Sequence, residues 1–329
     1  MIVLIGSKDS KRTDYFIKAA EKLGKSVHMI PWEELSEISV KQELRGVAVK
    51  IDPPSFQTVD ILAMREQLKR YQEMLRGLQG YSGYYLNIPE AILTVLDKRL
   101  TKQKLQQRVP VTEMLAEKLQ SSEEFFDCLS SSHCYQVFIK PVDFSGAAGV
   151  AAFRMQPSTG RTQLYTSASI RDGILYNTKR LFRLESKREI MGFLDALFRM
   201  DVIVERWYPK DTLDGKAYDL RVVYQFGHVA YIVVRKAGKG PITNLHLNNQ
   251  AESLEALKLS EDSFMKIEQL CGKACALFPG LQVAGVDVML DKGSRKPRII
   301  EINGQGDLIY QDIYDKNSIY EEQIIRMER

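Results

Sequence analysis

The sequence has few of the residues on which several classes of enzyme depend. It contains four cysteines and four histidines in 329 residues. Cys271 and Cys275 are one helical turn apart, which suits half of a metal site, but no second cysteine pair or His-x-x-x-His motif accompanies them. We therefore expect two core thiols here, and the scattered histidines predict neither a zinc site nor a catalytic triad.

Long apolar runs and strong net charge are also missing. No stretch approaches the ~20 apolar residues of a membrane helix. The opening MIVLIGSKDS has no basic segment before its apolar run and no small-residue cleavage site, so it predicts a first β-strand rather than a signal peptide. The formal net charge of +4 does not favour a dedicated nucleic-acid binder. We expect a cytoplasmic protein that has neither a membrane nor a nucleic acid as a partner.

What the chain does contain is typical of a globular protein with two or three packed subdomains. Its hydrophobic content is 44% and its charged content is 27%. Strand-like and helical stretches alternate up to about residue 90, which predicts a βαβ-type unit with a parallel sheet. The strands are IVLIGS, SVHMIPW and GVAVKI, and the helices cover about residues 11–23 and 59–77. The unit lacks the full G-x-G-x-x-G fingerprint, so dinucleotide binding is not predicted.

The rest of the chain predicts mixed strands and helices in two α+β halves. Expected strands are YQVFIKPV and GVAAFRM, joined by the loop DFSGAA, then VIVERWY, the hairpin DLRVVYQFGHVAYIVVRK, and finally AGVDVML and PRIIEIN. Expected helices cover about residues 97–107, a run from Thr112, and about residues 123–129, 187–199, 262–278 and 318–328.

The last of these strands ends in an unusual pattern. Ile299 and Ile300 predict a buried strand, but Glu301 and Asn303 then share one face while Ile302 takes the other. Asp287 likewise lies between two valines of AGVDVML. If the two strands are antiparallel neighbours, the three oxygen-bearing side chains converge. Such a set suits Mg²⁺, which is held by one or two carboxylates together with substrate phosphates; a simply solvated strand end is the alternative.

Other polar groups are placed where a nucleotide could meet them. Lys140 ends an apolar strand, and the small residues that follow, among them Ser145 and Gly146, let backbone N–H groups approach an anion. The strand VIVERWY stops at a proline, and its backbone could pair with the edge of a base. Arg221 and Arg235, on the two strands of the hairpin, are candidates to neutralise a transferred phosphate. Solvated strand ends remain the alternative for each of these basic residues.

In their order along the chain, these motifs resemble those of the ATP-grasp superfamily, especially its glutathione synthetase-like and ribosomal-protein S6 glutamate ligase-like branch. The resemblance extends over about residues 86–308. It implies an α/β N-terminal (pre-ATP-grasp, Rossmann-like) domain at residues 1–90, followed by an α+β ATP-grasp fold. The two ATP-grasp subdomains would occupy residues 91–205 and 206–329, with the metal site in the second.

The resemblance also implies a role for individual residues. LDKRLTKQK makes Lys98 the first nucleotide lysine, and FIKPVDFSGAAG makes Lys140, Ser145 and Gly146 part of the strand and loop that cover the phosphates. IVERWYPKD resembles the adenine hinge, with Glu205 and the backbone around Trp207 at the base and Asp211 at the ribose. The remaining implied residues are catalytic Arg221 and Arg235, nucleotide-binding Asn244, and the metal ligands Asp287, Glu301 and Asn303.

An ATP-dependent carboxylate–amine ligase is the function that the resemblance implies. Such an enzyme forms an amide or peptide bond through an acyl phosphate and releases ADP and phosphate. It would use ATP and Mg²⁺, with Mn²⁺ as a substitute, and would join a small-molecule or peptide carboxylate to an amine. A small-molecule kinase on the same fold and a non-catalytic nucleotide-binding protein are the alternatives, and an oligomer is left open. The sequence departs from the branch at Phe144 and Ala147, where glycines are frequent, and in the turn GQGDL, which lacks the usual proline.

Overall fold

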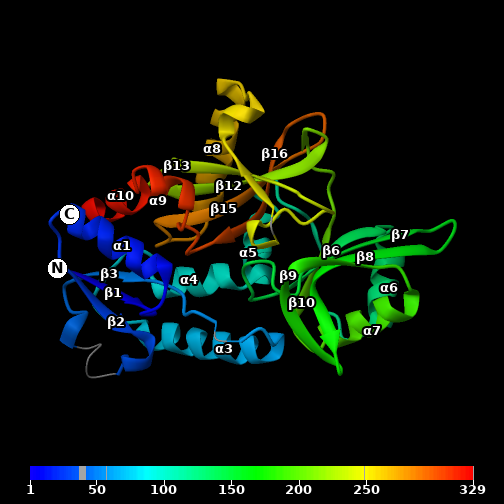
Figure 1. Cartoon of the computed structure of the whole chain (residues 1–329), viewed down its shortest axis with the longest axis horizontal. Helices are drawn as coiled ribbons and strands as arrows, with labels where there is room; N and C mark the ends of the chain where they lie inside the picture. The colour runs from blue at the N-terminus through cyan, green and yellow to red at the C-terminus, as the bar shows by residue number, and fades with distance from the viewer. Residues whose placement is uncertain (37–41, 57, 248, 329) are drawn as a thin grey trace.

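The N-terminal part of the chain forms a parallel sheet covered on both faces. The computed structural model describes residues 1–36, 42–56, 58–247 and 249–328. Figure 1 shows its fold, coloured from the N-terminus to the C-terminus. The four parallel strands have the order β2-β1-β3-β4: β1 (Ile2–Gly6), β2 (Val27–Pro31), β3 (Ala48–Ile51) and β4 (Tyr84–Tyr85). The 3₁₀ turn η1 (Trp32–Glu34) follows β2.

Alternate side chains of β1 explain why this sheet carries helices on both faces. Val3 and Ile5 are buried against α3 (Ile61–Leu78), whereas Ile2 and Leu4 are buried against α1 (Lys11–Lys22). The predicted parallel α/β unit is thereby confirmed, since a parallel sheet needs cover on both sides.

A second, antiparallel sheet carries the loop that joins Pro141 to Ala151. Its strand order is β5-β10-β6-β7-β8-β9, and α6 (Ser122–Ser131) and α7 (Lys187–Leu197) pack against it. The strands are β5 (Met114–Ala116), β6 (Gln136–Pro141), β7 (Ala151–Gln156), β8 (Arg161–Arg171), β9 (Ile174–Leu184) and β10 (Val202–Arg206).

The helical run predicted from Thr112 is wrong, because this segment is strand β5. Met114 pairs with Glu205 of β10, and the backbone N–H of Thr112 donates to the carbonyl of Ile299 at 2.9 Å. Partners that lie far away in the sequence therefore hold the segment extended, and a local helical pattern cannot reveal them.

The third sheet is also antiparallel and carries the predicted metal ligands. Its order is β14-β13-β12-β15-β16, with β11 paired to β12. The strands are β11 (Thr212–Leu213), β12 (Lys216–Gln225), β13 (His228–Lys236), β14 (Gln250–Glu252), β15 (Val283–Leu290) and β16 (Pro297–Asn303). The predicted β12–β13 hairpin is confirmed. Cys271 and Cys275 are buried in the core where α8 (Glu261–Cys275) covers this sheet.

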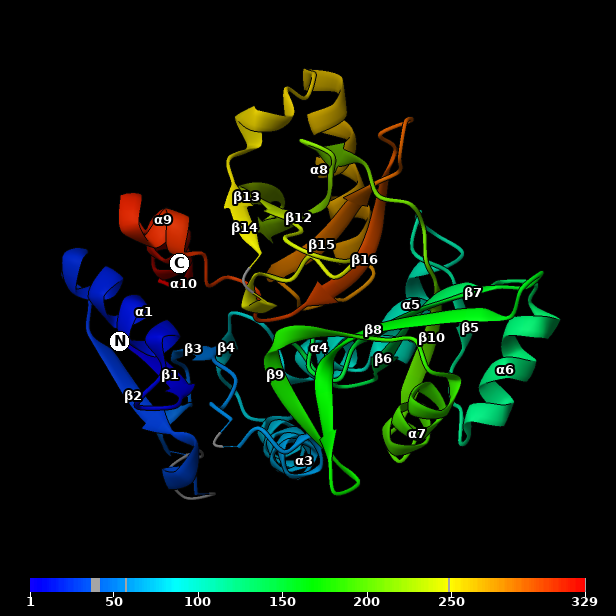
Figure 2. The same ribbon diagram turned by 45° about the vertical axis from the view of Figure 1, so that its right-hand side comes forward.

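The remaining helices lie between or after these sheets in the chain. These are α4 (Pro89–Leu96), α5 (Lys98–Leu105), α9 (Tyr310–Asp315) and α10 (Ser318–Met327), together with the 3₁₀ turns η2 (Leu245–Leu247) and η3 (Leu254–Leu257). The chain returns at its end to its beginning, since α9 and α10 lie beside α1 in both ribbon views (Figures 1 and 2). Phe16 and Tyr320 meet there edge to face, with ring centroids 5.7 Å apart. No helix of the described residues is long and apolar enough to span a membrane.

A bulge in β16 sets which side chains reach the cavity beside the sheet. Asp287 pairs with Glu301, but the next residue, Val288, pairs with Ile299, so Ile300 is an extra residue in the ladder. Ile299 and Ile302 consequently both face the core. The predicted burial of Ile300 within the strand is wrong, because the bulge turns it to the cavity wall beside Glu301.

Two glycines allow the turn after β16 to pack directly on β15. A Cβ built on Gly306 would lie 2.4 Å from Gly285 Cα and 2.7 Å from Arg221 Nη1. A Cβ on Gly285 would in turn lie 2.6 Å from Gly306 Cα. Only glycine fits such a close approach of two backbones, so the GQG turn is held against the sheet beneath Arg221.

Candidate active site

The predicted site residues converge on one cavity between the second and third sheets. Figure 2 shows the third sheet lying over the second. The cavity measures about 780 Å³ including its mouth. Most of the predicted residues line it: Lys98, Lys140, Ser145, Gly146, Glu205, Arg221, Arg235, Asn244, Asp287, Glu301 and Asn303.

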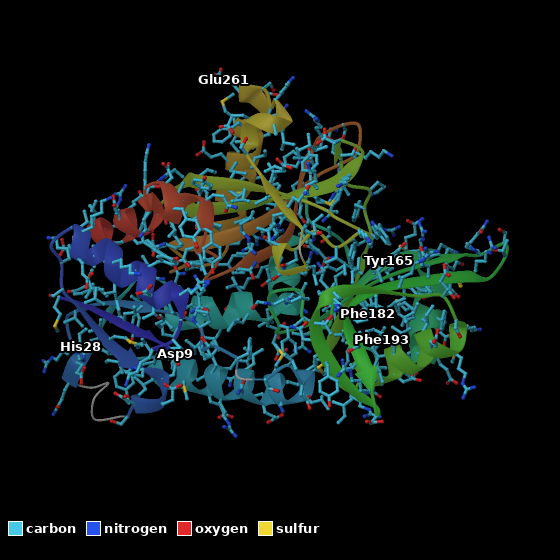
Figure 3. The ribbon with its side chains drawn as sticks, viewed as in Figure 1. Asp9, His28, Tyr165, Phe182, Phe193 and Glu261 are labelled. Atoms are coloured by element: carbon cyan, nitrogen blue, oxygen red, sulfur yellow. The ribbon has the colours of Figure 1, made fainter. Side chains whose placement is uncertain are left out.

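A loop from the third sheet reaches the second sheet beside this cavity. A Cβ built on Gly240, which has a positive φ of 72°, would lie 2.6 Å from Leu181 Cδ2 and 3.2 Å from Tyr165 Cδ1. Tyr165 is labelled in Figure 3 on the second sheet. The same segment continues into Thr243 and Asn244, which line the cavity, so the contact fixes where these residues lie.

The oxygen-bearing side chains lie on two neighbouring strands, next to an arginine on a third. Arg221 of β12 is the register partner of Asp287 on β15, which is the register partner of Glu301 on β16. Arg221 Nε lies 2.9 Å from Asp287 Oδ1, and Arg235 Nη2 lies 3.0 Å from Asp287 Oδ2. The side-chain amide of Asn303 bridges two of these residues. Its nitrogen donates to Glu301 Oε1 at 3.0 Å, and its oxygen accepts from Arg221 Nη1 at 3.2 Å. The convergence expected from the sequence is therefore present.

This set of oxygens fits a metal that a phosphate helps to hold. Asp287 Oδ1 is buried, and no donor among the described residues makes a well-aligned hydrogen bond to it, although Arg221 Nε is near. The described residues contain no cluster of three or more His, Cys, Asp or Glu side chains that could hold a metal alone. Two carboxylates and one amide therefore leave coordination positions for oxygens of a ligand, as Mg²⁺ sites at nucleotides do.

Two lysines share one buried carboxylate, Glu205, which lines the same cavity. Lys140 Nζ lies 2.8 Å from Glu205 Oε2 and Lys102 Nζ lies 3.3 Å from Glu205 Oε1. Burial opposes the charge on Lys140, but Glu205 and Glu301 outweigh it and raise the pKa of that lysine. Burial dominates at Lys102 and lowers its pKa to about 8. The pKa of Glu205 is lowered because the two lysines outweigh its burial.

Sequence reasoning missed Lys102, because only the fold shows that it is buried and paired with Glu205. Lys98 and Lys102 are four residues apart, which places them on the same face of α5. Both are buried. Because an unpaired buried ammonium group is costly, each lysine meets a carboxylate: Lys98 Nζ lies 3.9 Å from Glu301 Oε1, and Lys102 Nζ lies 3.3 Å from Glu205 Oε1.

The loop between β6 and β7 is anchored over the cavity. Lys98 Nζ donates to the carbonyl of Phe144 and lies 3.9 Å from Glu301 Oε1. Phe144 is buried, and its ring centroid lies 6.5 Å from that of Phe56. Ala147 has a positive φ of 65° and its carbonyl accepts from Ser167 Oγ at 2.6 Å. The two residues that replace frequent glycines are thus held by packing and hydrogen bonds.

Asp219 organises a second group of charges on the same wall. Its carboxylate accepts from Arg235 Nε and from Lys210 Nζ, both at 2.7 Å, and also from the Thr243 hydroxyl. Burial would raise the pKa of Asp219, but Arg235 and Lys210 outweigh it and hold that pKa well below its usual range. Asp219 and Asp287 together raise the pKa of Arg235. Lys210 was missed from the sequence, although it lies inside the predicted hinge.

Two of the predicted hinge residues do not line the cavity. The backbone N–H of Trp207 donates to the carbonyl of Gln136 at 3.0 Å. The Asp211 carboxylate accepts from Tyr218 Oη at 2.9 Å and from Arg295 Nε at 2.7 Å. Their neighbours Arg206, Tyr208 and Lys210 line the cavity in their place.

Two antiparallel sheets enclose a cavity lined by lysines, arginines and the side-chain oxygens of Asp287, Glu301 and Asn303. This arrangement is typical of an ATP-grasp fold. The chain belongs to the YheC/D-like ATP-grasp family, whose family model matches residues 92–323. The predicted membership of the ATP-grasp superfamily is therefore confirmed.

Solved structures that cover the whole chain agree with this fold. The ATP-grasp ligase PsnB, complexed with a phosphomimetic variant of its minimal precursor, Mg and ADP, is 15% identical, with a TM-score of 0.59 and coverage of 100% of this chain and 98% of that chain. D-cycloserine synthetase DcsG is 13% identical, with a TM-score of 0.63 and 99% of both chains covered. D-alanine–D-alanine ligase from Bacillus anthracis, complexed with ATP, is 13% identical, with a TM-score of 0.59, 99% of this chain and 94% of that chain. The comparison with curated proteins gave no match.

Proposed function

We propose that this protein is an ATP-dependent carboxylate–amine ligase that works through an acyl phosphate. The observation that carries the proposal is the row of Asp287, Glu301 and Asn303 beside Arg221 in an ATP-grasp cavity. The solved relatives of the same fold support it, since PsnB and D-alanine–D-alanine ligase are ligases by name. We also propose three domains, each built around one of the three sheets: residues 1–90, 91–205 and 206–329.

In this proposal the nucleotide lies across the cavity with its phosphates near Lys98 and Lys140. Mg²⁺ held by Asp287, Glu301 and Asn303 would supply positive charge at the β- and γ-phosphates. Lys140 would exchange its contact with Glu205 for a phosphate oxygen. The base would lie towards Arg206 and Tyr208, which line the same cavity.

The first step transfers the γ-phosphoryl group to the substrate. A carboxylate oxygen attacks the γ-phosphorus, the bond to the β–γ bridging oxygen breaks, and ADP leaves. Arg221 and Arg235, whose guanidinium groups face the metal ligands, would stabilise charge on the transferred group.

The second step forms the amide bond. The amine nitrogen attacks the acyl carbon, the carbon–oxygen bond to phosphate breaks, and the amine loses a proton to give the amide. The loop of Phe144 to Gly149 would exclude water from the acyl phosphate, which water otherwise hydrolyses. The anchoring of that loop through Lys98 and Phe144 supports this role.

The test is a screen for ADP release with amino acids and short peptides, in the presence of Mg²⁺ and ATP. Hydroxylamine is then added in place of the amine for each substrate that releases ADP. A hydroxamate of the substrate is the expected product, because hydroxylamine traps an acyl phosphate. A phosphorylated alcohol with no hydroxamate would identify a kinase instead, and tight ATP binding without turnover across the screen would identify a non-catalytic nucleotide-binding protein.

A further inference from the structure

A second cavity adjoins the nucleotide cavity, and the charged side chains that line it are all arginines. It shares Ser145, Asn303 and both site arginines with the nucleotide cavity and extends to α9. Among the described residues that line it, the charged side chains are Arg12, Arg221 and Arg235, and none is acidic. A cavity of this kind favours an anionic ligand.

Arg12 reaches this cavity from α1, far from the other two arginines in sequence. Its guanidinium group is paired with Asp307, which lies in the GQGDL turn and is itself buried. Among the described residues, Asp307 supplies the one hydrogen bond that Arg12 donates. A guanidinium group has five N–H donors, so Arg12 keeps donors for a ligand while Asp307 fixes its position.

A buried network holds Asp307 in turn. Its second carboxylate oxygen accepts from Lys50 Nζ at 2.9 Å and from Gln323 Nε2 at 3.2 Å. Lys50 also pairs with Asp52 at 2.7 Å. Lys50 lies on β3, Asp307 in the turn after β16, and Gln323 on α10. Segments from both ends of the chain therefore hold Arg12 at the cavity.

A third cavity on the other side of Arg12 shows that this charge pattern is not general. That cavity is lined by aromatic and aliphatic residues, and its charged residues are balanced. Arg12 and Lys98 are accompanied there by Asp143 and Glu301. The cavity next to α9 therefore differs in presenting guanidinium groups with no acidic side chain in its lining, since the carboxylates that pair with these arginines lie outside it.

We propose that Arg12, together with Arg221 and Arg235, recognises an anionic group of the substrate in addition to the carboxylate that is activated. The substrate class is thus a carboxylate that carries a further carboxylate, either in a free dicarboxylic amino acid or in an acidic peptide. The inference rests on the proposed ligase function.

Charge-matched probes test this subsite without requiring turnover. Isothermal titration is done in the presence of Mg²⁺ and a non-hydrolysable ATP analogue. One pair of probes is glutamate and glutamine, and the other is the blocked dipeptides Glu-Glu and Glu-Gln. In at least one pair, the acidic member should bind about tenfold or more tightly than its amide twin. Discrimination confined to the first pair indicates a free amino acid, and discrimination confined to the second indicates a peptide.

Variants of Arg12 and Lys11 assign this discrimination to one side chain. Arg12→Gln should reduce the preference to about twofold or less. Lys11→Gln, which removes an equal charge from an exposed neighbour that does not line the cavity and approaches it only over the outer Tyr310 ring, should preserve it. If Arg12→Gln does not fold, Arg12→Gln with Asp307→Asn removes both charges of the pair and takes its place.

Two results would overturn the subsite. Wild-type protein that binds both members of each pair equally has no second anion subsite, whether or not Arg12 variants fold. An Arg12 variant that keeps the full preference assigns it elsewhere. The ligase function is judged separately by the ADP-release screen: release of ADP without charge preference refutes the subsite alone, and charge preference without ADP release refutes the ligase alone.

Discussion

Lys140 and Glu301 are expected to bind different parts of the same ligand. Lys140 is buried against Glu205, and Glu301 is one of the proposed metal ligands, together with Asp287 and Asn303. A lysine that contacts phosphate in the ground state contributes mainly to affinity, whereas a metal ligand contributes mainly where transition-state charge develops.

We expect Lys140→Ala to weaken binding of an ATP analogue by roughly 10- to 100-fold, and Glu301→Gln to lower kcat by about 100-fold or more with a smaller change in affinity. Titration calorimetry and ADP release measure the two effects. Lys104→Ala and Glu261→Gln are matched controls, since both side chains are exposed; Glu261 is labelled in Figure 3, at the outer end of α8. Unchanged affinity and rate in Lys140→Ala would refute its assignment.

Lys102 is expected to make nucleotide binding depend on pH. Its pKa of about 8 results from burial, so the side chain is charged below that pH and neutral above it. Loss of this proton leaves Glu205 paired to Lys140 alone and makes Lys140 less available to phosphate. From about pH 7 to about pH 9 the affinity for an ATP analogue should fall roughly three- to tenfold. Lys102→Met should bind with little pH dependence across that range, and a wild-type affinity that rises with pH would contradict the assignment.

Charge pairs such as these were only partly predictable from the sequence. Asp287, Glu301 and Asn303 stand out because polar side chains interrupt apolar strands. Lys102 and Lys210 do not stand out, since each is one of many lysines until the fold brings Glu205 or Asp219 to within 3.3 Å and 2.7 Å, respectively. The partners are distant in the sequence, and only tertiary packing identifies them.

The turn after β16 shows how one element supports the site. Gln305 lines the cavity next to α9, Asp307 pairs with Arg12, and Gly306 packs on Gly285. Gln305 Nε2 donates to the Ile51 carbonyl at 2.8 Å and its Oε1 accepts from Tyr71 Oη at 3.0 Å. The turn therefore joins the first and third sheets.

Gly306→Ala should destabilise the fold by about 1–3 kcal/mol, because its Cβ would meet backbone atoms that cannot turn aside. Gly192→Ala is the control, since it lies within α7 with no atom within 4 Å of the added Cβ. This second substitution should stabilise the protein by about 0.5–1 kcal/mol through higher helix propensity. Chemical denaturation measures both values, and a Gly306→Ala protein as stable as wild type would contradict the close backbone contact.

Elements with strong local patterns were predicted and those made by long-range pairing were not. The βαβ unit, the β12–β13 hairpin and the antiparallel pair β15–β16 follow from apolar runs and turn residues. β5 and the bulge at Ile300 depend on β10 and on the register with β15. The residues around β5 and around Ile300 contain no local pattern that identifies the strand with which each of them pairs.

Nucleotide and metal should stabilise the folded protein cooperatively. Asp287, Glu301 and Asn303 offer too few oxygens to complete the coordination sphere of a metal. No cluster of His, Cys, Asp or Glu side chains among the described residues substitutes for them. We expect the rise in Tm with Mg²⁺ and ATP together to exceed the sum of the rises with each alone. Differential scanning calorimetry measures this, with Asp287→Asn as the variant that should lose most of the excess. Equal shifts for ATP with and without Mg²⁺ would count against the metal site.

We expect the bond of ATP that breaks to be the one between its β- and γ-phosphates. Lys98, Lys140, Arg221 and the proposed metal ligands Asp287, Glu301 and Asn303 all line the same cavity, so they would stabilise charge at the β–γ bridge. Cleavage there gives ADP and phosphate, whereas cleavage at the α-phosphate would give AMP and pyrophosphate.

The most direct measurement follows the oxygen of the substrate carboxylate. A substrate found by the ADP-release screen is labelled with ¹⁸O in its carboxylate and converted to amide product with unlabelled ATP in unlabelled water. Mass spectrometry of the products should find one ¹⁸O atom in inorganic phosphate and none in the nucleotide, because the carboxylate oxygen leaves with the phosphate of an acyl phosphate. Label in AMP, or phosphate that carries no label while amide is formed, would contradict the proposed mechanism.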